Sequence, residues 1–467
     1  MTAAGANTGQ APAGSAGKLP TRTIVGFAVG SLGTGIYSSV PSVLLLFYMT
    51  QILGISPGLA GLAVFLPKIW DVITDPAMGF ISDHTRSRLG RRRPYLLVGA
   101  ILMSVTFVFL FSAPDLGSEW NSFLYVVIVF ALSATAYTIY AVPYIAMPSE
   151  MSSDHKERTV IMSFRMAFAM GGILLGLTLA PYLVSWFGGG REGYAAMSYT
   201  VGLICAASMI VAFVATRNAP RVDRAEGTKI NVWAHFEDVL KSRSFRILVA
   251  IYILQLTAMG TFSGAVPYYI FYVVGGDTAM IGTFFLILLG SAIVTMPFWT
   301  FLAHRAGKRV AFTISAVVFG VGTATLFQMT NAGLDVPLIS VLVLIGFGLS
   351  GIQMLPFSML TDVIRHAALT GGGAREGTFT GLWTSSEKLG LAVGPLIVGW
   401  GLQVAGFSET EGVPSESVLF SVRMLVGALP GIAIVLSAAM VFLYPLREKD
   451  LAALEDANLN VSPSVGK

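Results

Sequence analysis

The sequence predicts an all-α membrane protein in which twelve transmembrane helices form two six-helix halves. Of its 467 residues, 54% are hydrophobic and only 12% are charged, whereas a soluble globular domain carries about 25% charged residues. A chain of this length with so little charge lacks the polar surface that a soluble protein exposes to water. Apolar stretches long enough to cross a bilayer, about 20 residues each, recur from residue 22 to residue 444.

The first six apolar stretches predict an N-terminal half, residues 21–216. Residues 1–20 are rich in Ala, Gly, Pro and Thr and lack the apolar core of a cleavable signal peptide, so they predict a disordered tail. The helices of this half are expected at 22–52, 57–82, 95–113, 121–147, 160–187 and 195–216.

A polar, charged segment, residues 217–244, predicts a central loop between the two halves. The C-terminal half, residues 245–446, is followed by a second tail, residues 447–467. Its helices are expected at 245–273, 279–302, 309–330, 336–360, 379–405 and 418–444.

Basic residues gather in alternate loops. The loops between the other pairs of spans hold one basic residue, Arg191, and several acidic ones. By the positive-inside rule, both termini and the central loop are expected in the cytoplasm, and the protein in the inner (plasma) membrane of a bacterium. An odd number of spans would scramble this alternation, so the charges support the count of twelve. The basic loops carry Arg86, Arg88, Arg91, Arg92, Arg93, Lys156, Arg158, Arg305, Lys308, Arg309, Arg365, Arg375, Arg447 and Lys449.

The two halves resemble each other weakly. Residues 79–93 join the second and third spans, and residues 302–309 join the eighth and ninth at the equivalent place. Pro143 in the fourth span and Pro356 in the tenth lie at similar depth. Two such halves, with interrupted helices around a central cavity, are typical of transporters that work by alternating access.

Three charged residues lie together in the second predicted span. Lys68, Asp71 and Asp75 are spaced i, i+3 and i+7, which places them on one helix face. Ionisable residues inside a membrane are costly and usually functional. Two carboxylates one turn apart repel each other unless a positive group lies between them. The functional interpretation is a Na⁺ or H⁺ site formed by Asp71 and Asp75, and the alternative is a structural cluster of ion pairs.

Two threonines are candidates to complete a cation site. Na⁺ needs several oxygen ligands, and Thr74, next to Asp75, and Thr138, in the fourth span, carry hydroxyl groups. For each threonine, the alternative is a hydroxyl that bonds back to its own helix.

Further charges lie in other predicted spans. Lys388, in the eleventh span, can fill an emptied cation site or pair with its acids, as Lys68 can. Arg165, in the fifth span, can be a charge partner or a donor to a substrate, because its fork geometry suits both roles. Glu387 points about 100° away from Lys388 on a helix, and its role stays open.

Aromatic and polar side chains at mid-depth predict substrate contacts. The rings could stack on a sugar or another ring, and the amides and hydroxyls could bond a substrate's hydroxyl groups. Packing between helices is the alternative for each one. Together with Arg165, the candidates are Tyr140, Tyr144, Tyr268, Gln255, Gln353, Trp383 and Thr384.

The sequence predicts no enzyme, cofactor or nucleic-acid partner. All five histidines lie in predicted cytoplasmic loops, and HExxH and Walker A patterns are absent from the chain. The single cysteine, Cys205, excludes a disulfide framework and a thiolate metal site. The net charge of +4 follows the membrane topology and forms no patch. An ion gradient, or the substrate's own gradient, is therefore the expected energy source.

Two adjoining segments carry a resemblance to a known family. Residues 68–79 (KIWDVITDPAMG) hold the acid pair and an Asp-Pro, and residues 83–94 (DHTRSRLGRRRP) form a long Thr-Arg-Ser-Arg-x-Gly loop. With residues 142–144 (VPY), Arg165 and Lys388, this pattern resembles the glycoside–pentoside–hexuronide:cation symporters, which include melibiose permease and belong to the major facilitator superfamily. The resemblance covers nearly the whole chain and implies the twelve-helix major facilitator fold.

The resemblance implies particular roles for these residues. Asp71 and Asp75 match the cation-site carboxylates, and Thr138 matches a position that contributes to that site. Thr74 stands where melibiose permease has an asparagine, so an oxygen is kept. The loop between the second and third spans is expected to gate the conformational change, through Gly79, Asp83, Arg86, Arg88, Gly90 and Arg91.

The resemblance also shows departures at the substrate site. Arg165 and Lys388 match residues that link the sugar and cation sites of the family. The sugar-binding Lys-Asp pair of melibiose permease aligns with Thr34 and Gly35, and its second sugar-binding aspartate with Ala141. The acidic clamp for a galactoside is therefore missing, and an anionic substrate such as a hexuronide, or a more apolar cargo, becomes an alternative.

The sequence thus predicts a monomeric symporter that couples Na⁺ or H⁺ to a small-molecule substrate. A sugar, glycoside or uronide is the favoured class of cargo. A lysolipid or another amphiphile is the alternative, since animal carriers of this wider group move lysolipids. A membrane sensor or scaffold without transport activity is an alternative of a different class, but it would need a signalling domain or a long tail.

Overall fold

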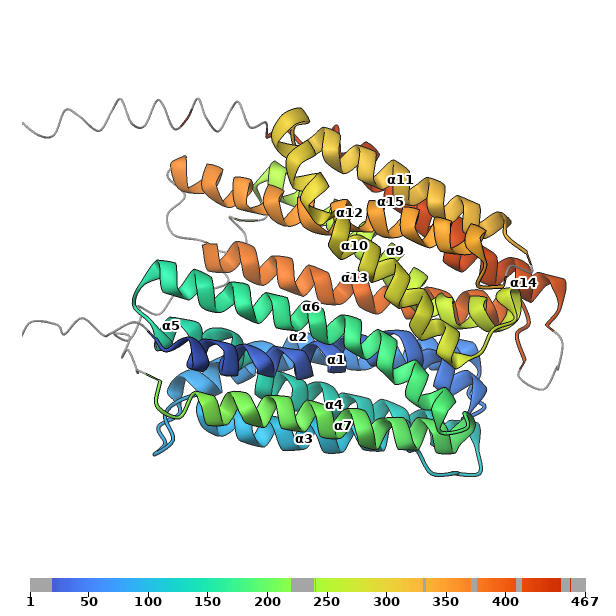
Figure 1. Cartoon of the computed structure of the whole chain (residues 1–467), viewed down its shortest axis with the longest axis horizontal. Coiled ribbons are helices and arrows are strands. Elements are labelled where there is room, and N and C mark those ends of the chain that lie inside the picture. The colour runs from blue at the N-terminus through green and yellow to red at the C-terminus, as the bar shows by residue number, and fades with distance from the viewer. Residues whose placement is uncertain are drawn as a thin grey trace, which may run out of the picture.

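The computed structural model describes residues 19–219, 239, 241–330, 333–370, 376–408, 414–446 and 454, and this part of the chain is all-helical (Figure 1). The expected all-α fold is therefore confirmed. The predicted tails, apart from residues 19, 20 and 454, and most of the predicted central loop lie outside the described residues.

Seven helices form the N-terminal half. The helix α1 packs along α6 and α7, and α4 packs between α2 and α3. They are α1 (Thr21–Gln51), α2 (Pro57–His84), α3 (Arg93–Phe111), α4 (Glu119–Ala146), the single turn α5 (Pro148–Met151), α6 (His155–Trp186) and α7 (Gly190–Ala215).

The C-terminal half repeats this order. The helix α9 packs along α13 and α15, and α12 packs between α10 and α11. The elements are α9 (Arg243–Tyr269), the π-helical turn η1 (Ile270–Val274), α10 (Thr278–Ala306), α11 (Lys308–Gln328), α12 (Val336–Leu369), α13 (Glu376–Val404), α14 (Glu416–Arg423), the π-helical turn η2 (Met424–Ala428) and α15 (Leu429–Val441).

The number of long helices agrees with the count of twelve. Eleven helices in the described part are long and apolar enough to cross a membrane. The helix α13, with 29 residues, is the remaining long helix and carries Glu387 and Lys388 near its middle. Both charges lower the hydropathy of this helix.

Three helices extend five or more residues further than their apolar stretches predicted. The helix α12 continues to Leu369 instead of ending near residue 360, α6 begins at His155 instead of residue 160, and α7 begins at Gly190 instead of residue 195. Hydropathy marks the part of a helix that lies in the hydrocarbon, while backbone hydrogen bonding continues into polar residues. Asp154 caps α6, because its side chain accepts a hydrogen bond of 3.0 Å from the backbone N–H of Lys156.

The expected interruptions at prolines are absent from the fourth and tenth spans as the structure describes them. The helices α4 and α12 continue through Pro143 and Pro356. The irregular turns lie instead at η1 and η2, in the seventh and twelfth spans.

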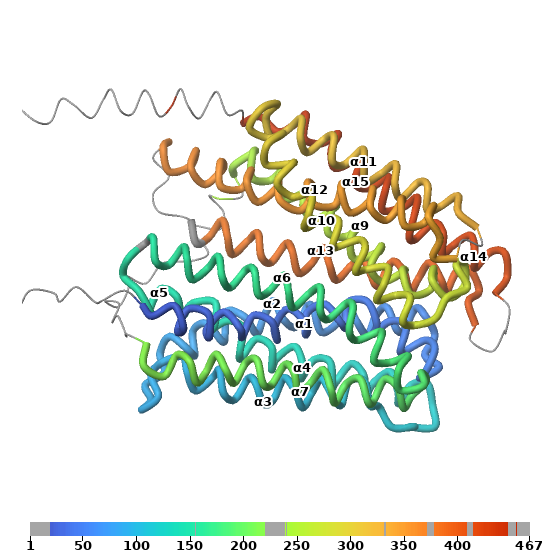
Figure 2. Tube along the Cα trace, viewed as in Figure 1, coloured from blue at the N-terminus to red at the C-terminus, as the bar shows by residue number. Residues whose placement is uncertain are grey.

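The two halves meet along three helix pairs: the equivalent helices α1 and α9, and two contacts that the repeat relates to each other. The helix α2 packs against α13, α6 against α10, and α1 against α9. We call the end of the bundle with the α2–α3 loop (residues 85–92) the basic end, and the opposite end the far end. Figure 2 shows that the two halves converge at the far end and diverge toward the basic end.

Hydrogen bonds join the halves at the far end. The hydroxyls of Thr50 on α1 and Tyr268 on α9 are 2.7 Å apart, and the Tyr272 hydroxyl donates to Gln51 over 2.9 Å. At the end of α6, the Ser185 hydroxyl donates a hydrogen bond of 3.0 Å to the carboxylate of Asp277, the residue before α10.

Glycines allow this close approach. A Cβ atom at Gly399 of α13 would lie 2.2 Å from the carbonyl oxygen of Pro57, and one at Gly61 of α2 would lie 2.9 Å from that of Pro395. Small residues at helix interfaces let backbones approach within membranes. The far end is therefore a closed, tightly packed contact between the halves.

Removing the Tyr268 hydroxyl is expected to loosen this closure. In Tyr268→Phe the bond to Thr50 is lost, and because a hydrogen bond contributes about 1 kcal/mol, the fraction of molecules opened at the far end should rise roughly fivefold. Hydrogen–deuterium exchange at the far-end turns of α1 and α9 measures this opening. Tyr125→Phe is the matched control, since its hydroxyl donates to Phe109 within one half over 2.9 Å. Equal exchange in both variants would contradict the assignment.

Candidate functional site

The charged face of α2 lies at mid-depth and points toward the other half. The Asp71 residue is only 2% exposed, although it carries a carboxylate. The Nζ atom of Lys68, one turn earlier, is 3.8 Å from Asp71 Oδ2. The i, i+3 spacing noted in the sequence thus forms an ion pair within the helix.

Lys388 of α13 reaches this face from the C-terminal half. Its Nζ atom is 3.8 Å from Asp71 Oδ2 and forms a close ion pair with Asp75 Oδ2. One ammonium group therefore lies between the two carboxylates and separates their charges. Because the acids belong to one half and the lysine to the other, this cluster also joins the halves at mid-depth.

The two candidate threonines behave differently. The Thr138 hydroxyl of α4 donates a hydrogen bond of 2.8 Å to Asp75 Oδ1, so this residue joins the cluster. The Thr74 hydroxyl instead lies 3.3 Å from the Trp70 carbonyl oxygen and 3.5 Å from that of Asp71, both on its own helix. In this arrangement the Thr74 hydroxyl bonds to the backbone and not to the carboxylates of Asp71 and Asp75.

One oxygen of this cluster lacks a partner. Asp71 Oδ1 is buried and has no hydrogen-bond donor within the described residues. An unsatisfied buried polar atom costs free energy, and for a carboxylate oxygen a cation or a proton would remove that cost. With Asp75 and Thr138 nearby, the donor set consists of oxygens, which hard cations such as Na⁺ prefer.

Arg165 lies apart from the acids, on α6. Its guanidinium carbon is 5.7 Å from the centre of the Tyr144 ring, and its Nε is buried without a partner in the described part of the chain. The Tyr144 hydroxyl is 2.8 Å from the Ser31 hydroxyl and donates to the Phe27 carbonyl oxygen over 2.6 Å. The hydroxyl of Tyr140 is buried without such a partner. Arg165 and Tyr140 therefore keep hydrogen-bonding capacity that a ligand could use.

A second group of residues lies in the C-terminal half. Trp383 of α13 stacks on Tyr252 of α9, with ring centres 3.8 Å apart and planes 13° from parallel. Glu387, one turn after Trp383, lies within hydrogen-bonding reach of the Tyr252 hydroxyl. The open question about Glu387 is thus answered in part: it faces α9, while Lys388 faces α2. Tyr252 was not among the sequence candidates.

The remaining substrate candidates are dispersed. Gln255 donates to the Ile352 carbonyl oxygen, and its own carbonyl oxygen is buried without a partner among the described residues. Gln353 is exposed, and the exposed Thr384 bonds back to Thr380 over 3.0 Å. Tyr268 lies at the far end, in the contact with α1, and is not near the other candidates.

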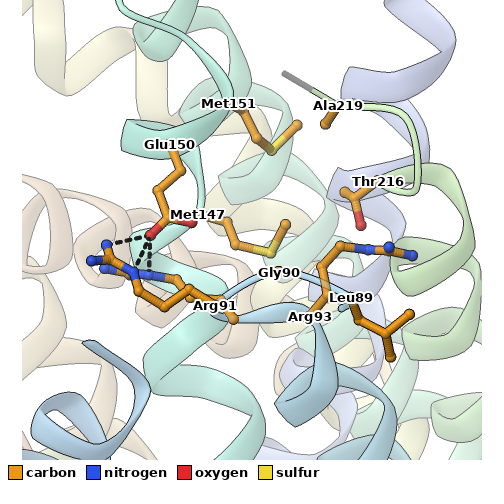
Figure 3. Close-up of a pocket in the computed structure, with 10 residues that line it drawn as sticks. Leu89, Gly90, Arg91, Arg93, Met147, Glu150, Met151, Thr216 and Ala219 are labelled. Carbon is orange, nitrogen blue, oxygen red and sulfur yellow. Dashed lines mark hydrogen bonds and ion pairs between the residues drawn. The ribbon is translucent and has the colours of Figure 1, made fainter. Parts of the chain in front are cut away.

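The predicted gating loop forms a charge network at the basic end. Glu150 of α5 accepts hydrogen bonds from Arg91, as Figure 3 shows. A carboxylate oxygen of Glu150 also lies 2.6 Å from Arg92 Nε. Asp83 at the end of α2 lies 2.9 Å from Arg92 and 3.9 Å from Arg91. Gly90, in the loop between Asp83 and Arg91, has a φ of 100°, a backbone conformation that favours glycine.

Parts of this network were not among the sequence candidates. Glu150 and Arg92 join the predicted Asp83 and Arg91, whereas the predicted Arg86 and Arg88 are exposed. No local signal singles out Glu150, because Asp154 and Glu157 also lie in these basic loops. Gly79 lies within α2, next to α4, with Val142 3.8 Å from the position of its missing Cβ.

Comparison with known proteins gives a consistent result. Residues 26–448 match the family described as MFS/sugar transport protein. A putative glycoside/cation symporter of Escherichia coli (strain K12) is 28% identical, over 94% of this chain and 94% of its own. A sodium-dependent lysophosphatidylcholine symporter of Xenopus tropicalis is 23% identical, over 92% of this chain and 88% of its own.

Solved structures with the same arrangement of helices are also found. A bacterial homologue of the human lysosomal transporter Spinster, in an inward-facing and unoccupied conformation, superposes with a TM-score of 0.70 and covers 92% of this chain and 98% of its own. At 14% sequence identity this likeness concerns the fold alone. The family and the fold are those of transporters rather than enzymes.

Proposed function

The chain belongs to the MFS/sugar transport protein family, and on that premise we propose that it is a symporter that couples Na⁺ or H⁺ to a sugar, glycoside or uronide. This membership agrees with the resemblance of the second span and the following loop to the glycoside–pentoside–hexuronide:cation symporters. The coupling ion and the cargo are the parts that go beyond the family.

One observation supports the cation site above all others. Lys388 pairs with both acids of α2, while Asp71 Oδ1 stays buried without a partner among the described residues. A cation that binds Asp71, Asp75 and Thr138 would displace the lysine, and the lysine would neutralise the acids again after the cation leaves. Because this exchange makes or breaks a contact between the halves, it couples cation binding to their relative movement.

The substrate would bind between the halves, near the same depth. Trp383 and Tyr252 stack on each other and are almost completely buried, and beside them and on α6, Glu387 and Arg165 offer an acceptor and a donor for hydroxyl groups. This combination favours a polyhydroxylated ring over a purely apolar cargo. A lysolipid would require an apolar opening beside Arg165.

The orientation follows from charge. We place the basic end in the cytoplasm, because positively charged loops are retained there. With the far end closed by hydrogen bonds between the halves, the structure then corresponds to an inward-facing conformation of an inner-membrane protein.

Uptake into proteoliposomes tests the proposal. Radiolabelled glycosides, uronides and a lysolipid are offered with an inward Na⁺ gradient, an inward H⁺ gradient or no gradient. The wild type should accumulate at least one sugar-class substrate with one of the ions, and Asp75→Ala should lose that dependence. Asp115→Ala, which changes an exposed far-end acid, should behave as the wild type.

Two results would count against the proposal. If Asp75→Ala keeps the cation dependence of the wild type, the site is wrongly assigned. If the lysolipid is the only substrate that accumulates, the assignment of the cation site is unaffected, but the proposed sugar-class cargo is wrong.

A further inference from the structure

A mostly apolar groove of about 470 Å³ lies on the N-terminal half, next to the basic end. Its walls come from α2, α3 and α4, and the first residues of the α2–α3 loop border it. Ile81, Tyr95, Val98 and Ile139 are among its lining residues. Two cation-site candidates, Thr74 and Thr138, line the groove, whereas none of the substrate candidates does.

The groove opens toward the membrane rather than toward the other half. On α3, Val98 is continued at helical spacing by Leu102, Val105 and Phe109, which are all exposed. On α4, Ile139 lies on the same face as the exposed Leu132, Ile128 and Leu124. Contiguous exposed apolar residues on spanning helices face hydrocarbon, so lipid chains have direct access to the groove. These residues form the lipid-facing stripe.

Two arginines lie in the loop whose first residues border the groove. Arg86 and Arg88 flank Ser87, which lines the groove, and both are exposed. Within the described part of the chain they have no acidic partner, whereas Arg91 and Arg92 are held by Glu150. An anionic group beside this loop would therefore meet two unneutralised guanidinium groups, which suit phosphate oxygens.

We propose that this groove is a binding site for an anionic phospholipid of the leaflet at the basic end. One acyl chain lies between Ile81, Val98 and Ile139, and the phosphate binds Arg86 and Arg88. The volume is roughly three times that of the ~150 Å³ apolar cavity that takes up benzene, so it can hold a substantial part of a chain.

The charges distinguish this site from the ordinary lipid shell. Lipid tails are as apolar as the groove, so burial alone gives little preference for one lipid over another. Each basic side chain near an anionic surface contributes about fivefold in affinity. The groove therefore selects for the headgroup at its entrance and only accommodates the chain.

The bound lipid would also contact the neighbourhood of the cation cluster. Thr138, which donates to Asp75, is one of the groove's lining residues. An acyl chain there keeps water away from this hydrogen bond from the membrane side. The lipid site itself does not depend on the proposed transport activity, because its evidence comes from the groove and the loop.

Native mass spectrometry of the full chain tests the site. The purified protein is incubated with phosphatidylglycerol or with phosphatidylcholine of the same acyl chains, and the lipid that stays bound is counted as collision energy rises. The wild type should retain one phosphatidylglycerol after phosphatidylcholine has dissociated. In the double variant Arg86→Gln/Arg88→Gln, retention should fall roughly tenfold or more.

Filling the groove gives a second readout. Ile139→Trp and Val98→Trp, on opposite walls, should each lose the retained lipid, so the test does not depend on the folding of one variant. Leu124→Trp, on the lipid-facing stripe far from the groove, and Arg305→Gln, in the last turn of α10 at the basic end of the other half, are matched controls that should retain it. Equal retention of the two lipids, or equal loss in Leu124→Trp, would overturn the proposal in favour of general lipid contact.

Discussion

Replacing Lys388 by alanine should reduce concentrative uptake about 100-fold or more while substrate exchange continues. The lysine separates Asp71 and Asp75, with 3.8 Å to Asp71 Oδ2 and a close pair with Asp75. Breaking a buried ion pair costs about 3–5 kcal/mol, and each 1.4 kcal/mol changes a rate tenfold. Because Lys388 is partly exposed, we expect a cost of about 3 kcal/mol, at the lower end of this range.

The separation of uptake and exchange follows from charge. Without Lys388, the cluster keeps two acids and Lys68 alone, so a bound cation neutralises it and an empty site carries a net negative charge. Loaded carriers can still change conformation, but empty carriers cannot return. Uptake and counterflow in the same proteoliposomes measure the two processes.

A matched variant tests the specificity of this effect. Lys308→Ala removes a lysine that pairs with Asp362 over 2.7 Å at the basic end of the same half. It should affect uptake and counterflow equally or not at all. If Lys388→Ala lowers both processes to the same degree, the lysine holds the halves together and does not replace the cation.

The second large effect is expected on stability. Asp71→Asn removes the carboxylate that faces both Lys68 and Lys388, and Asp71 is almost completely buried. Lys388 keeps Asp75 as its partner, whereas Lys68, whose side chain is 35% exposed, is left without the carboxylate that it faces. Because water partly screens this ammonium, the free energy of unfolding should fall by about 2–3 kcal/mol, less than for a fully buried pair. Thermal unfolding of the purified protein in detergent measures this loss, and where the wild type binds Na⁺ in calorimetry, that binding should disappear in the variant.

A double variant separates charge from cation binding. Asp71→Asn/Lys68→Met removes one uncompensated ammonium, so it should regain much of the lost stability and still bind no Na⁺. Asp115→Asn, at an exposed position, should change neither quantity. If the double variant is no more stable than Asp71→Asn, the loss does not come from the unpaired lysine.

Much of the fold could be predicted because its main signals are local. Helix number, the division into halves and the position of Lys68, Asp71 and Asp75 on one face follow from hydropathy and from the period of the helix. A spanning segment must satisfy its own backbone hydrogen bonds, so an apolar stretch of sufficient length already determines a helix. The ends of α6 and α12 were misplaced, because this signal stops where the polar residues begin.

The partners within the site were harder to predict, because they come from different helices. Lys388 was a candidate for its charge alone. Its contact with Asp71 and Asp75 depends on how α13 packs against α2. Tyr252 and Glu150 were missed, because a tyrosine or a glutamate near a helix end has no distinguishing local pattern.

The sequence alone determined that this protein is a twelve-helix membrane protein of two halves with charges placed at mid-depth, since the cost of burying charge in lipid makes each such residue conspicuous. Only the tertiary structure decided which charges pair. It joined Lys388 to the acids of α2, turned Glu387 toward Tyr252, and separated Arg165 and Tyr268 from the cluster. The physical reason is that the face a side chain presents follows from its own helix, whereas the group it meets is set by packing between helices.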